Sequence, residues 1–301
     1  MERFIDPRTL ARVKDLPLVA RTVADGFLHG IQASHQKGVG IEFSQYRSYE
    51  PGDEPGRIDW KLYARSDRYF IREAERESEI AIWIVLDCSG SMAQRSDSAA
   101  PGGWSKFDYG RHLAATVSWI AQRQGDMVGF MALSGETQEV LRPQTGERQW
   151  HRILKALHAV QPGGGMPPAA RVQALLGQLQ RPGLVLVISD LHQASDEIHA
   201  LLRRISTQHN EVACLQLQCE DELSFPWRGP TRFVDLETGE ELLVSGRSAR
   251  EQYLAGLETH QAQLTRSLAL LGISLETVNI DQPMDAALHA FLTRRQRRLG
   301  P

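Results

Sequence analysis

Residues 80–92 constrain this chain most, because an apolar run ends there in three evenly spaced side chains that carry oxygen. Residues 80–86 are all apolar, as in a strand that is buried on both faces of a parallel sheet. Asp87, Ser89 and Ser91 then follow at alternate positions, and the glycine between the serines allows a tight turn. Small oxygen ligands that converge in this way suit Mg²⁺. The pattern predicts half of a metal site at the carboxyl end of a strand, where open α/β sheets bind ligands.

A second apolar strand is expected over residues 184–190, and it also ends on an aspartate, Asp190. Helical and strand periodicities alternate around these two strands. We expect helices at about 106–124, 148–160, 169–180, 196–207, 249–271 and 284–293, strands at 127–133, 138–141, 212–217 and 273–278, and a hairpin of 231–236 with 241–244. This alternation predicts an α/β fold with a doubly wound, mainly parallel sheet, in which the two aspartate-ending strands can lie side by side.

The composition is that of an ordinary globular chain of 301 residues, 42% hydrophobic and 24% charged. No apolar run approaches the ~18 residues of a membrane helix, and the N-terminus does not resemble a signal peptide. We therefore expect a cytoplasmic protein without an integral membrane segment. Three cysteines without metal-type spacing are expected to be reduced, buried thiols. The net charge of -3 gives no indication of nucleic-acid binding.

The residue pattern before residue 78 differs from that of the predicted sheet domain. A helix is expected over residues 8–29, and a polar, aromatic-rich segment begins at Gly38. The expected organisation is an N-terminal helix and irregular arm over residues 1–77, the sheet domain over 78–296, and a basic tail over 297–301.

Two sets of motifs resemble known families. Asp87-Cys-Ser-Gly-Ser91, together with Asp190, resembles the metal-ion-dependent adhesion site of von Willebrand factor A domains, which adds a threonine from a second loop. The arm resembles the signature of the bacterial family called domain of unknown function 58 (DUF58). Its motifs are Gly40-Ile-Glu-Phe43, Tyr46-Arg-Ser-Tyr49, Pro51-Gly-Asp53, Arg57-Ile-Asp-Trp60 and Ala64-Arg65. The resemblance covers residues 28–295 and implies a von Willebrand factor A-like fold.

The resemblance assigns Asp87, Ser89 and Ser91 to the first metal loop and Asp190 to the third. The second loop departs from the family, because residues 163–168 have no hydroxyl and Met166 stands near the expected threonine. A thioether is a soft ligand and a poor one for magnesium. We therefore expect Mg²⁺ or Mn²⁺ to bind with reduced affinity.

The arm carries alternating charged and aromatic residues that favour a structural role. Charge-assisted pairs can fix such a segment to a neighbouring domain, and a tryptophan among charges usually packs as an anchor. The alternative is a partner-binding face, because arginine, tyrosine and tryptophan are enriched in interaction hot spots. The residues concerned are Arg47, Tyr49, Asp53, Arg57, Asp59, Trp60 and Arg65.

The expected function is a non-enzymatic adaptor that binds an acidic side chain of a partner through Mg²⁺. The resemblance implies work with a MoxR-type AAA+ ATPase, and with other von Willebrand A-type proteins, in protein maturation or remodelling. The chain has no Gly-x-x-x-x-Gly-Lys-Ser/Thr loop, so any ATP hydrolysis is expected from the partner.

Two alternatives stay open at this stage. One is a metal-free structural adaptor with the same fold. The other is a serine hydrolase that uses Ser89 or Ser91 with Asp190 and His192, although the Gly-x-Ser-x-Gly elbow is absent around Ser89.

Overall fold

The computed structural model describes most of the sheet domain and short parts of the arm. Contacts between Cα atoms divide the chain into two compact units, Gly30–Glu79 and Met1–His29 with Ile80–Pro301. Within the described ranges, no helix is both long enough and apolar enough to cross a membrane. The described residues are 15–35, 46–48, 63, 69–72, 81–97, 103–134, 139–165, 167, 172–174, 177, 179, 182–192, 197–207 and 210–299.

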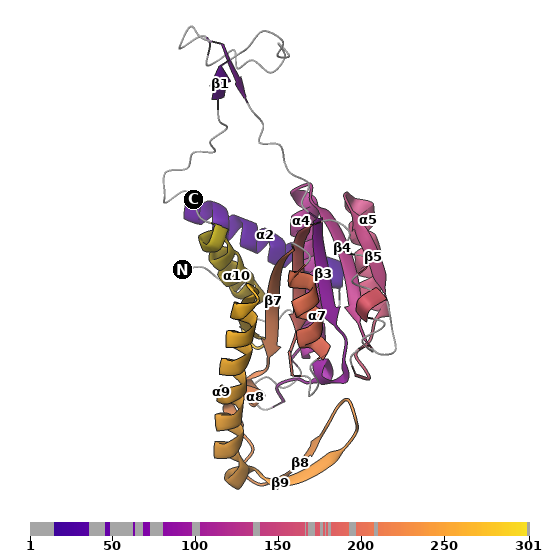
Figure 1. Ribbon diagram of the computed structural model, residues 1–301, viewed down its shortest axis with the longest axis vertical. Coiled ribbons are helices and arrows are strands. Elements are labelled where there is room, and N and C mark those ends of the chain that lie inside the picture. The colour runs from indigo at the N-terminus through magenta and orange to yellow at the C-terminus, as the bar shows by residue number, and fades with distance from the viewer. Residues whose placement is uncertain are drawn as a thin grey trace. The chain divides into compact units, whose positions relative to one another are not determined.

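A six-stranded sheet forms the centre of the larger unit, with the strand order β10-β7-β6-β3-β4-β5 (Figure 1). All neighbours are parallel except β5, which runs antiparallel to β4 at one edge. The strands are β3 (Ala81–Asp87), β4 (Met127–Leu133), β5 (Val140–Gln144), β6 (Gly183–Ser189), β7 (Glu211–Gln218) and β10 (Ser274–Asn279). This order confirms the doubly wound, mainly parallel sheet.

The two aspartate-ending strands lie side by side, as the sequence predicted. Strands β3 and β6 are parallel neighbours, with Ala81 opposite Gly183. The chain continues from β3 to β4 on one side, whereas β6 lies on the other, so the winding direction reverses at β3. The carboxyl ends of β3 and β6 therefore form the topological switch point, where sheets of this kind place their ligands.

Helices cover both faces of the sheet and agree with the expected positions to within a few residues at most ends. Helix α4 begins at a capping box, in which Ser105 accepts a hydrogen bond from the Asp108 N–H. Residues 172–174 are helical, and most of the helix expected over 169–180 lies outside the described residues. The helices are α2 (Leu16–His35), α4 (Lys106–Arg123), α5 (Glu147–Ala159), α7 (Glu197–Ser206), α8 (Glu220–Ser224), α9 (Gly246–Leu270) and α10 (Met284–Leu299).

The two faces of β3 pack against different helices. Trp83 and Val85 belong to a buried cluster with apolar residues of α7 and α9. On the opposite face, α4 approaches so closely that a Cβ on Gly110 would lie 3.0 Å from Leu86 Cδ1. Burial on both faces explains why the strand has an unbroken apolar sequence rather than an alternating one.

Helix α2 packs on the helices of the α4 face. The Arg21 guanidinium lies 4.7 Å from the Trp119 ring centroid and 5.0 Å from that of Trp150. Val19 and Val23 are buried. The start of the helix expected over residues 8–29 lies outside the described residues.

The smaller unit contains an antiparallel pair, β1 (Tyr46–Ser48) and β2 (Phe70–Arg72). Arg47 lies in β1 opposite Ile71, and the Tyr63 ring stacks on Tyr69 with centroids 4.5 Å apart. The structural and partner-binding interpretations of the arm both stay predictions. Tyr49, Asp53, Arg57, Asp59, Trp60 and Arg65 lie outside the described residues.

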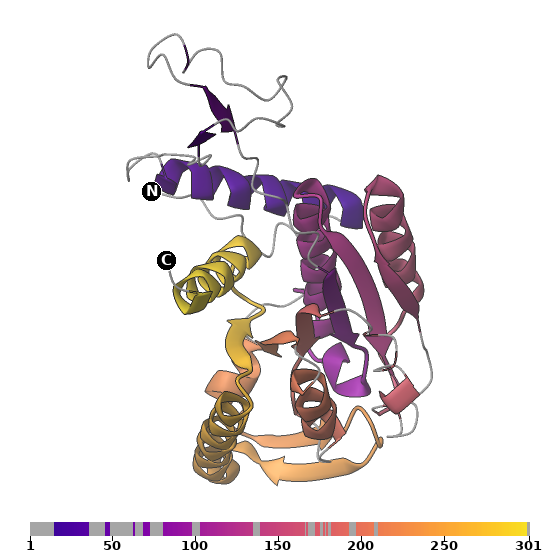
Figure 2. The ribbon, with the colours of Figure 1, turned by 45° about the horizontal axis from the view of Figure 1, so that its top comes forward.

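A hairpin of β8 (Pro230–Val234) and β9 (Glu241–Ser245) precedes α9, close to where the sequence predicted one. Gly239 has a φ of +76° in its turn, a conformation that glycine adopts readily. Figures 1 and 2 show the hairpin, in orange, extending from α9 past the end of the sheet at which β3 terminates.

Candidate metal centre

Asp87 is the last residue of β3, and its side chain is fully buried. Its Oδ1 accepts a hydrogen bond from the Ser89 backbone N–H at 2.9 Å, and its Oδ2 accepts one from the Ser189 hydroxyl at 2.5 Å. The carboxylate is thus held from its own loop and from the neighbouring strand β6.

Asp190 follows β6 directly and is also fully buried. Its Oδ1 accepts a hydrogen bond from the His192 N–H at 3.3 Å. Burial raises the pKa of Asp87, and the negative charge of Asp190 raises it further. The two aspartates are therefore close enough to repel one another at one edge of the sheet.

The two serines of the first loop also come together. Their Oγ atoms lie 3.0 Å apart, with Ser89 buried and Ser91 partly exposed. A short 3-10 helix, η2 (Gly90–Ala93), begins between them and turns the chain away from the sheet. The structure thus brings all four residues of the predicted metal site, Asp87, Ser89, Ser91 and Asp190, to the same strand ends.

The glycine-rich second loop packs against the first. The Gly90 N–H donates to the Gly164 carbonyl at 2.7 Å, and the Gly163 N–H donates to the Cys88 carbonyl at 3.0 Å. The Ser134 hydroxyl donates to the Gly163 carbonyl at 3.3 Å. The second loop therefore packs directly on the first, and its Gly163 and Gly164 carbonyls accept hydrogen bonds there. Met166 lies outside the described residues.

Lys106 enters the site from the start of α4, and no local sequence pattern indicates this. Its Nζ lies 3.1 Å from Asp190 Oδ2, 2.5 Å from Glu222 Oε1 and 3.2 Å from Gln94 Oε1. The side chain is 1% exposed. Its carboxylate partners are 84 and 116 residues away in sequence, so no short motif could have revealed the cluster.

Lys106 and its carboxylate partners stabilise one another's ionised forms. Burial alone would lower the pKa of Lys106, but Asp190 and Glu222 outweigh it and raise that pKa. Burial would likewise raise the pKa of Asp190, but the charges and hydrogen bonds of Lys106 and His192 together outweigh it and lower that pKa. Glu222, from the short helix α8, is fixed in place because its Oε2 also accepts from the Cys219 N–H at 2.9 Å. A charged lysine thus lies beside one of the candidate metal ligands.

Glu237, at the tip of the β8–β9 hairpin, is the other residue that the sequence did not single out. The Ser91 hydroxyl interacts with its carboxyl. Burial raises the pKa of Glu237, and the charges of Asp87 and Asp190 raise it further. A third carboxylate therefore lies in the electric field of the two aspartates.

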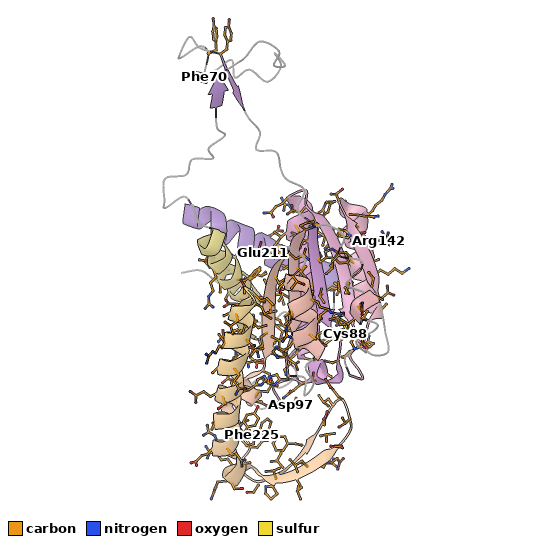
Figure 3. All side chains as sticks on the ribbon, in the orientation of Figure 1. Phe70, Cys88, Asp97, Arg142, Glu211 and Phe225 are labelled. Atoms are coloured by element: carbon orange, nitrogen blue, oxygen red, sulfur yellow. The ribbon has the colours of Figure 1, made fainter. Side chains whose placement is uncertain are left out.

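A large cavity adjoins the site between the hairpin and α9. Its volume is about 880 Å³, and its wall includes Ser91, Gln94 and Glu222. Its far wall is aromatic, where the Phe225 ring lies 4.7 Å from Tyr253 and 5.1 Å from Trp227. Figure 3 labels Cys88, between Asp87 and Ser89, and Phe225, between α9 and the hairpin.

Residues 45–263 match the family described as "Protein of unknown function DUF58". The chain belongs to the DUF58 family. This membership confirms the resemblance of the arm motifs to DUF58.

The DUF58 chain is also similar to an uncharacterised protein of Mycobacterium tuberculosis (strain H37Rv). The two are 25% identical over 296 residues, which cover 97% of this chain and 91% of the relative.

Two solved structures are similar at a low level. One is the conserved hypothetical protein BatB from Bacteroides thetaiotaomicron, with a TM-score of 0.41 and 11% identity over 71% of this chain and 99% of that one. The other is the SpRpn10 VWA domain, with a TM-score of 0.39 and 13% identity. The match covers 70% of this chain and 94% of that domain. The fold assignment of the DUF58 chain rests on its own strand order.

The donor chemistry of the site fits a hard divalent cation. Carboxylate, hydroxyl and carbonyl oxygens are the ligands that Mg²⁺ and Mn²⁺ prefer. No three His, Cys, Asp or Glu side chains gather as a metal-binding group in the part of the chain that the structure describes. Asp87 and Asp190 alone therefore leave most of the coordination shell of a cation in this DUF58 protein to other oxygen atoms.

His192, which the hydrolase alternative requires, lies close to Asp190 and to His260. Its ring stacks on His260 with centroids 5.7 Å apart. Its Nε2 has no hydrogen-bond partner among the described residues.

Proposed function

We propose that this DUF58 protein is a non-enzymatic interaction module that binds an acidic side chain of a partner protein through a divalent cation, Mg²⁺ or Mn²⁺. The observation that supports the proposal best is the convergence of Asp87, Ser89, Ser91 and Asp190 at the switch point of the sheet. When bound, the cation supplies an open coordination position for a partner's carboxylate.

The protein's own residues prepare the site in distinct ways. Ser189 and the Ser89 backbone orient the Asp87 carboxylate, so that it needs little rearrangement on binding. Lys106 holds Asp190 in its ionised form. The second loop lacks the family's threonine, so that water or a backbone carbonyl would have to fill its position, and for this reason we propose a lower affinity than a complete site would have.

The partner that we propose is a MoxR-type AAA+ ATPase, acting with this adaptor in protein maturation or remodelling. The support for this partner is the family resemblance of the arm and of the first metal loop. The aromatic cavity beside Ser91 offers apolar contacts next to the acid-binding position. In such interfaces, a few central residues that pack into pockets contribute most of the binding energy.

Lys106 favours one alternative, a metal-free adaptor of the same fold. Its ammonium already neutralises part of the negative charge at the strand ends, and an ammonium can hold a carboxylate without a metal. Carboxylates still outnumber this one ammonium in the cluster of Asp87, Asp190, Glu222 and Lys106. That excess of negative charge is why we place the cation-dependent function first.

Complex formation with the MoxR-type ATPase of the same genome tests the proposal. We would compare co-elution of the ATPase, assembled in Mg²⁺ and ATP, with wild type, Asp87→Ala and Asp97→Ala. Asp97 is an exposed aspartate that lies beyond η2 and serves as the matched control. The proposal predicts loss of the complex for Asp87→Ala alone. Equal co-elution of all three proteins would favour the metal-free adaptor, and no co-elution of wild type would contradict the partner.

A further inference from the structure

The tip of the β8–β9 hairpin lies directly on the first metal loop. The Leu236 carbonyl is so near Gly90 that a Cβ added to this glycine would lie 2.2 Å from the carbonyl oxygen. A Cβ on Gly165, in the second loop, would lie 3.8 Å from Glu237 Oε2. The tip therefore packs on the first loop of the candidate site and lies near the second.

The side chain at this tip reaches the predicted ligands themselves. The Ser91 hydroxyl acts on the Glu237 carboxyl and lowers its pKa, and the Ser91 Oγ lies 3.0 Å from that of Ser89. The charges of Asp87 and Asp190 act on the Glu237 carboxyl, which is partly buried. Glu237 is thus a fifth residue with oxygen atoms near the candidate metal site, and it lies outside the sheet.

The turn that carries Glu237 is tightly fixed. Asp235 Oδ1 accepts hydrogen bonds from the N–H groups of Glu237 at 2.8 Å and Thr238 at 3.2 Å. The Gly239 N–H donates to the Asp235 carbonyl at 2.8 Å. The carboxylate is therefore presented on a preorganised support, which reduces the entropy lost when it binds.

The base of the hairpin is anchored as well. The Phe233 ring lies 5.2 Å from Trp227 and 5.7 Å from Phe225, and the Gly246 N–H donates to the Gly229 carbonyl at 2.9 Å. These contacts hold the strands in place while the tip projects over the strand ends.

We propose that Glu237 is an internal ligand of the candidate metal site, occupying the coordination position that a partner's acidic side chain takes after displacing the hairpin tip. This inference rests on the proposed function and adds a mode of regulation to it. The chain would block its own acid-binding position, and only a partner whose contacts outweigh those of the tip would gain access.

Electrostatics give the cation a role in closing the tip. Three carboxylates, those of Asp87, Asp190 and Glu237, repel one another without a cation, and a divalent cation between them turns this repulsion into attraction. Cation binding and tip closure therefore strengthen one another, and this coupling is reciprocal by thermodynamic necessity. Loss of the Glu237 charge should weaken cation binding, although the residue lies outside the first loop.

Two variants and a matched control test the internal ligand. Glu237→Gln keeps the size and hydrogen-bonding capacity of the side chain but removes its charge. Gly90→Ala places a methyl group against the Leu236 carbonyl and should push the tip away, while it keeps the first-loop side chains. Glu240→Gln removes an exposed carboxylate from the same hairpin and serves as the control.

The readout is Mn²⁺ binding to the full-length protein, with water-proton relaxation reporting the water molecules on the bound ion. We expect Glu237→Gln and Gly90→Ala to bind Mn²⁺ at least ~10-fold more weakly, as is usual when support of a metal site is lost. The bound ion should carry one more water molecule in both variants, and added acetate should displace that water. Wild type and Glu240→Gln should show neither change.

The outcomes separate this inference from the proposed function. If wild type and Glu237→Gln bind Mn²⁺ with equal affinity and equal hydration, Glu237 is not a ligand, while the metal site itself stands. If wild type binds no Mn²⁺ and Asp87→Ala behaves identically, the metal site is absent and the internal ligand is overturned with it.

Discussion

Lys106 Nζ lies 3.1 Å from Asp190 Oδ2, and the two side chains are 1% and 0% exposed. A buried ion pair of this kind contributes little when it is compared with an apolar pair of the same shape, but removal of one partner is costly. The lysine therefore fixes the electrostatics of the strand ends whether or not a cation is present.

Replacement of Lys106 by methionine should destabilise the protein by ~3–5 kcal/mol, because Asp190 and Glu222 would then lose their buried counter-ion. Urea unfolding at neutral pH measures this change. Adding Glu222→Gln to the variant should recover part of the loss. The exposed Lys155→Met control should change stability by less than ~0.5 kcal/mol. Equal effects of the two single substitutions would contradict the importance of this ion pair.

The free energy of unfolding should fall as the pH is lowered from 6.5 to about 4, because buried His112 stays neutral in the folded protein over this range. Burial lowers the pKa of His112 from its ordinary 6.5 to about 4, and Arg111 adds to the effect while Asp108 opposes it. Between these two values the unfolded chain binds the proton and the folded protein does not, so the contribution is present above 6.5 and is lost as the pH falls towards 4. The expected loss is on the order of 3 kcal/mol.

Thermal unfolding between about pH 7.5 and 4.5 checks this sign for wild type and His112→Gln, which should depend less on pH. His151→Gln is the matched control. Both imidazoles bond through Nδ1 to the carbonyl four residues earlier, but His151 is exposed. A pH dependence that is the same in wild type and His112→Gln would overturn the assignment.

The three cysteines should be unreactive in the folded protein. All are buried, as the sequence predicted, and burial raises the pKa of Cys214 and of Cys219 to about 12. Burial, followed by the charge of Asp87, raises the pKa of Cys88 well above its ordinary value. Since the thiolate is the reactive form, iodoacetamide at pH 8 should label the cysteines only after unfolding in urea. Rapid labelling of any one of them in the native protein would contradict this burial.

The parts of the site that were predictable lie at the ends of apolar strands. Asp87 and Asp190 could be placed at one edge because β3 and β6 have unbroken apolar sequences, and parallel strands end at a common edge. Lys106 and Glu237 could not be found in this way. In the sequence, Lys106 is an ordinary residue in the first turn of a helix, and Glu237 is an ordinary residue of a polar hairpin turn.

Their roles arise only from tertiary contacts. The short helix α8, which the sequence did not predict, brings Glu222 to Lys106, and packing of the hairpin on Gly90 brings Glu237 to Ser91. Local periodicity therefore predicts the sheet and its helices, whereas the charges that tune the site depend on segments more than 80 residues apart.

The cation itself gives the most direct test of the account. The chelator-treated protein would be titrated with Mg²⁺ and Mn²⁺ while its thermal midpoint is measured, beside Asp87→Ala and the exposed control Asp97→Ala. A ligand that binds only the folded state raises stability by RT ln(1 + [metal]/Kd), or ~2.7 kcal/mol at a hundredfold excess over Kd. We expect a saturable rise for wild type and Asp97→Ala and none for Asp87→Ala. Flat or identical curves for all three proteins up to ~10 mM metal would contradict the proposed metal site.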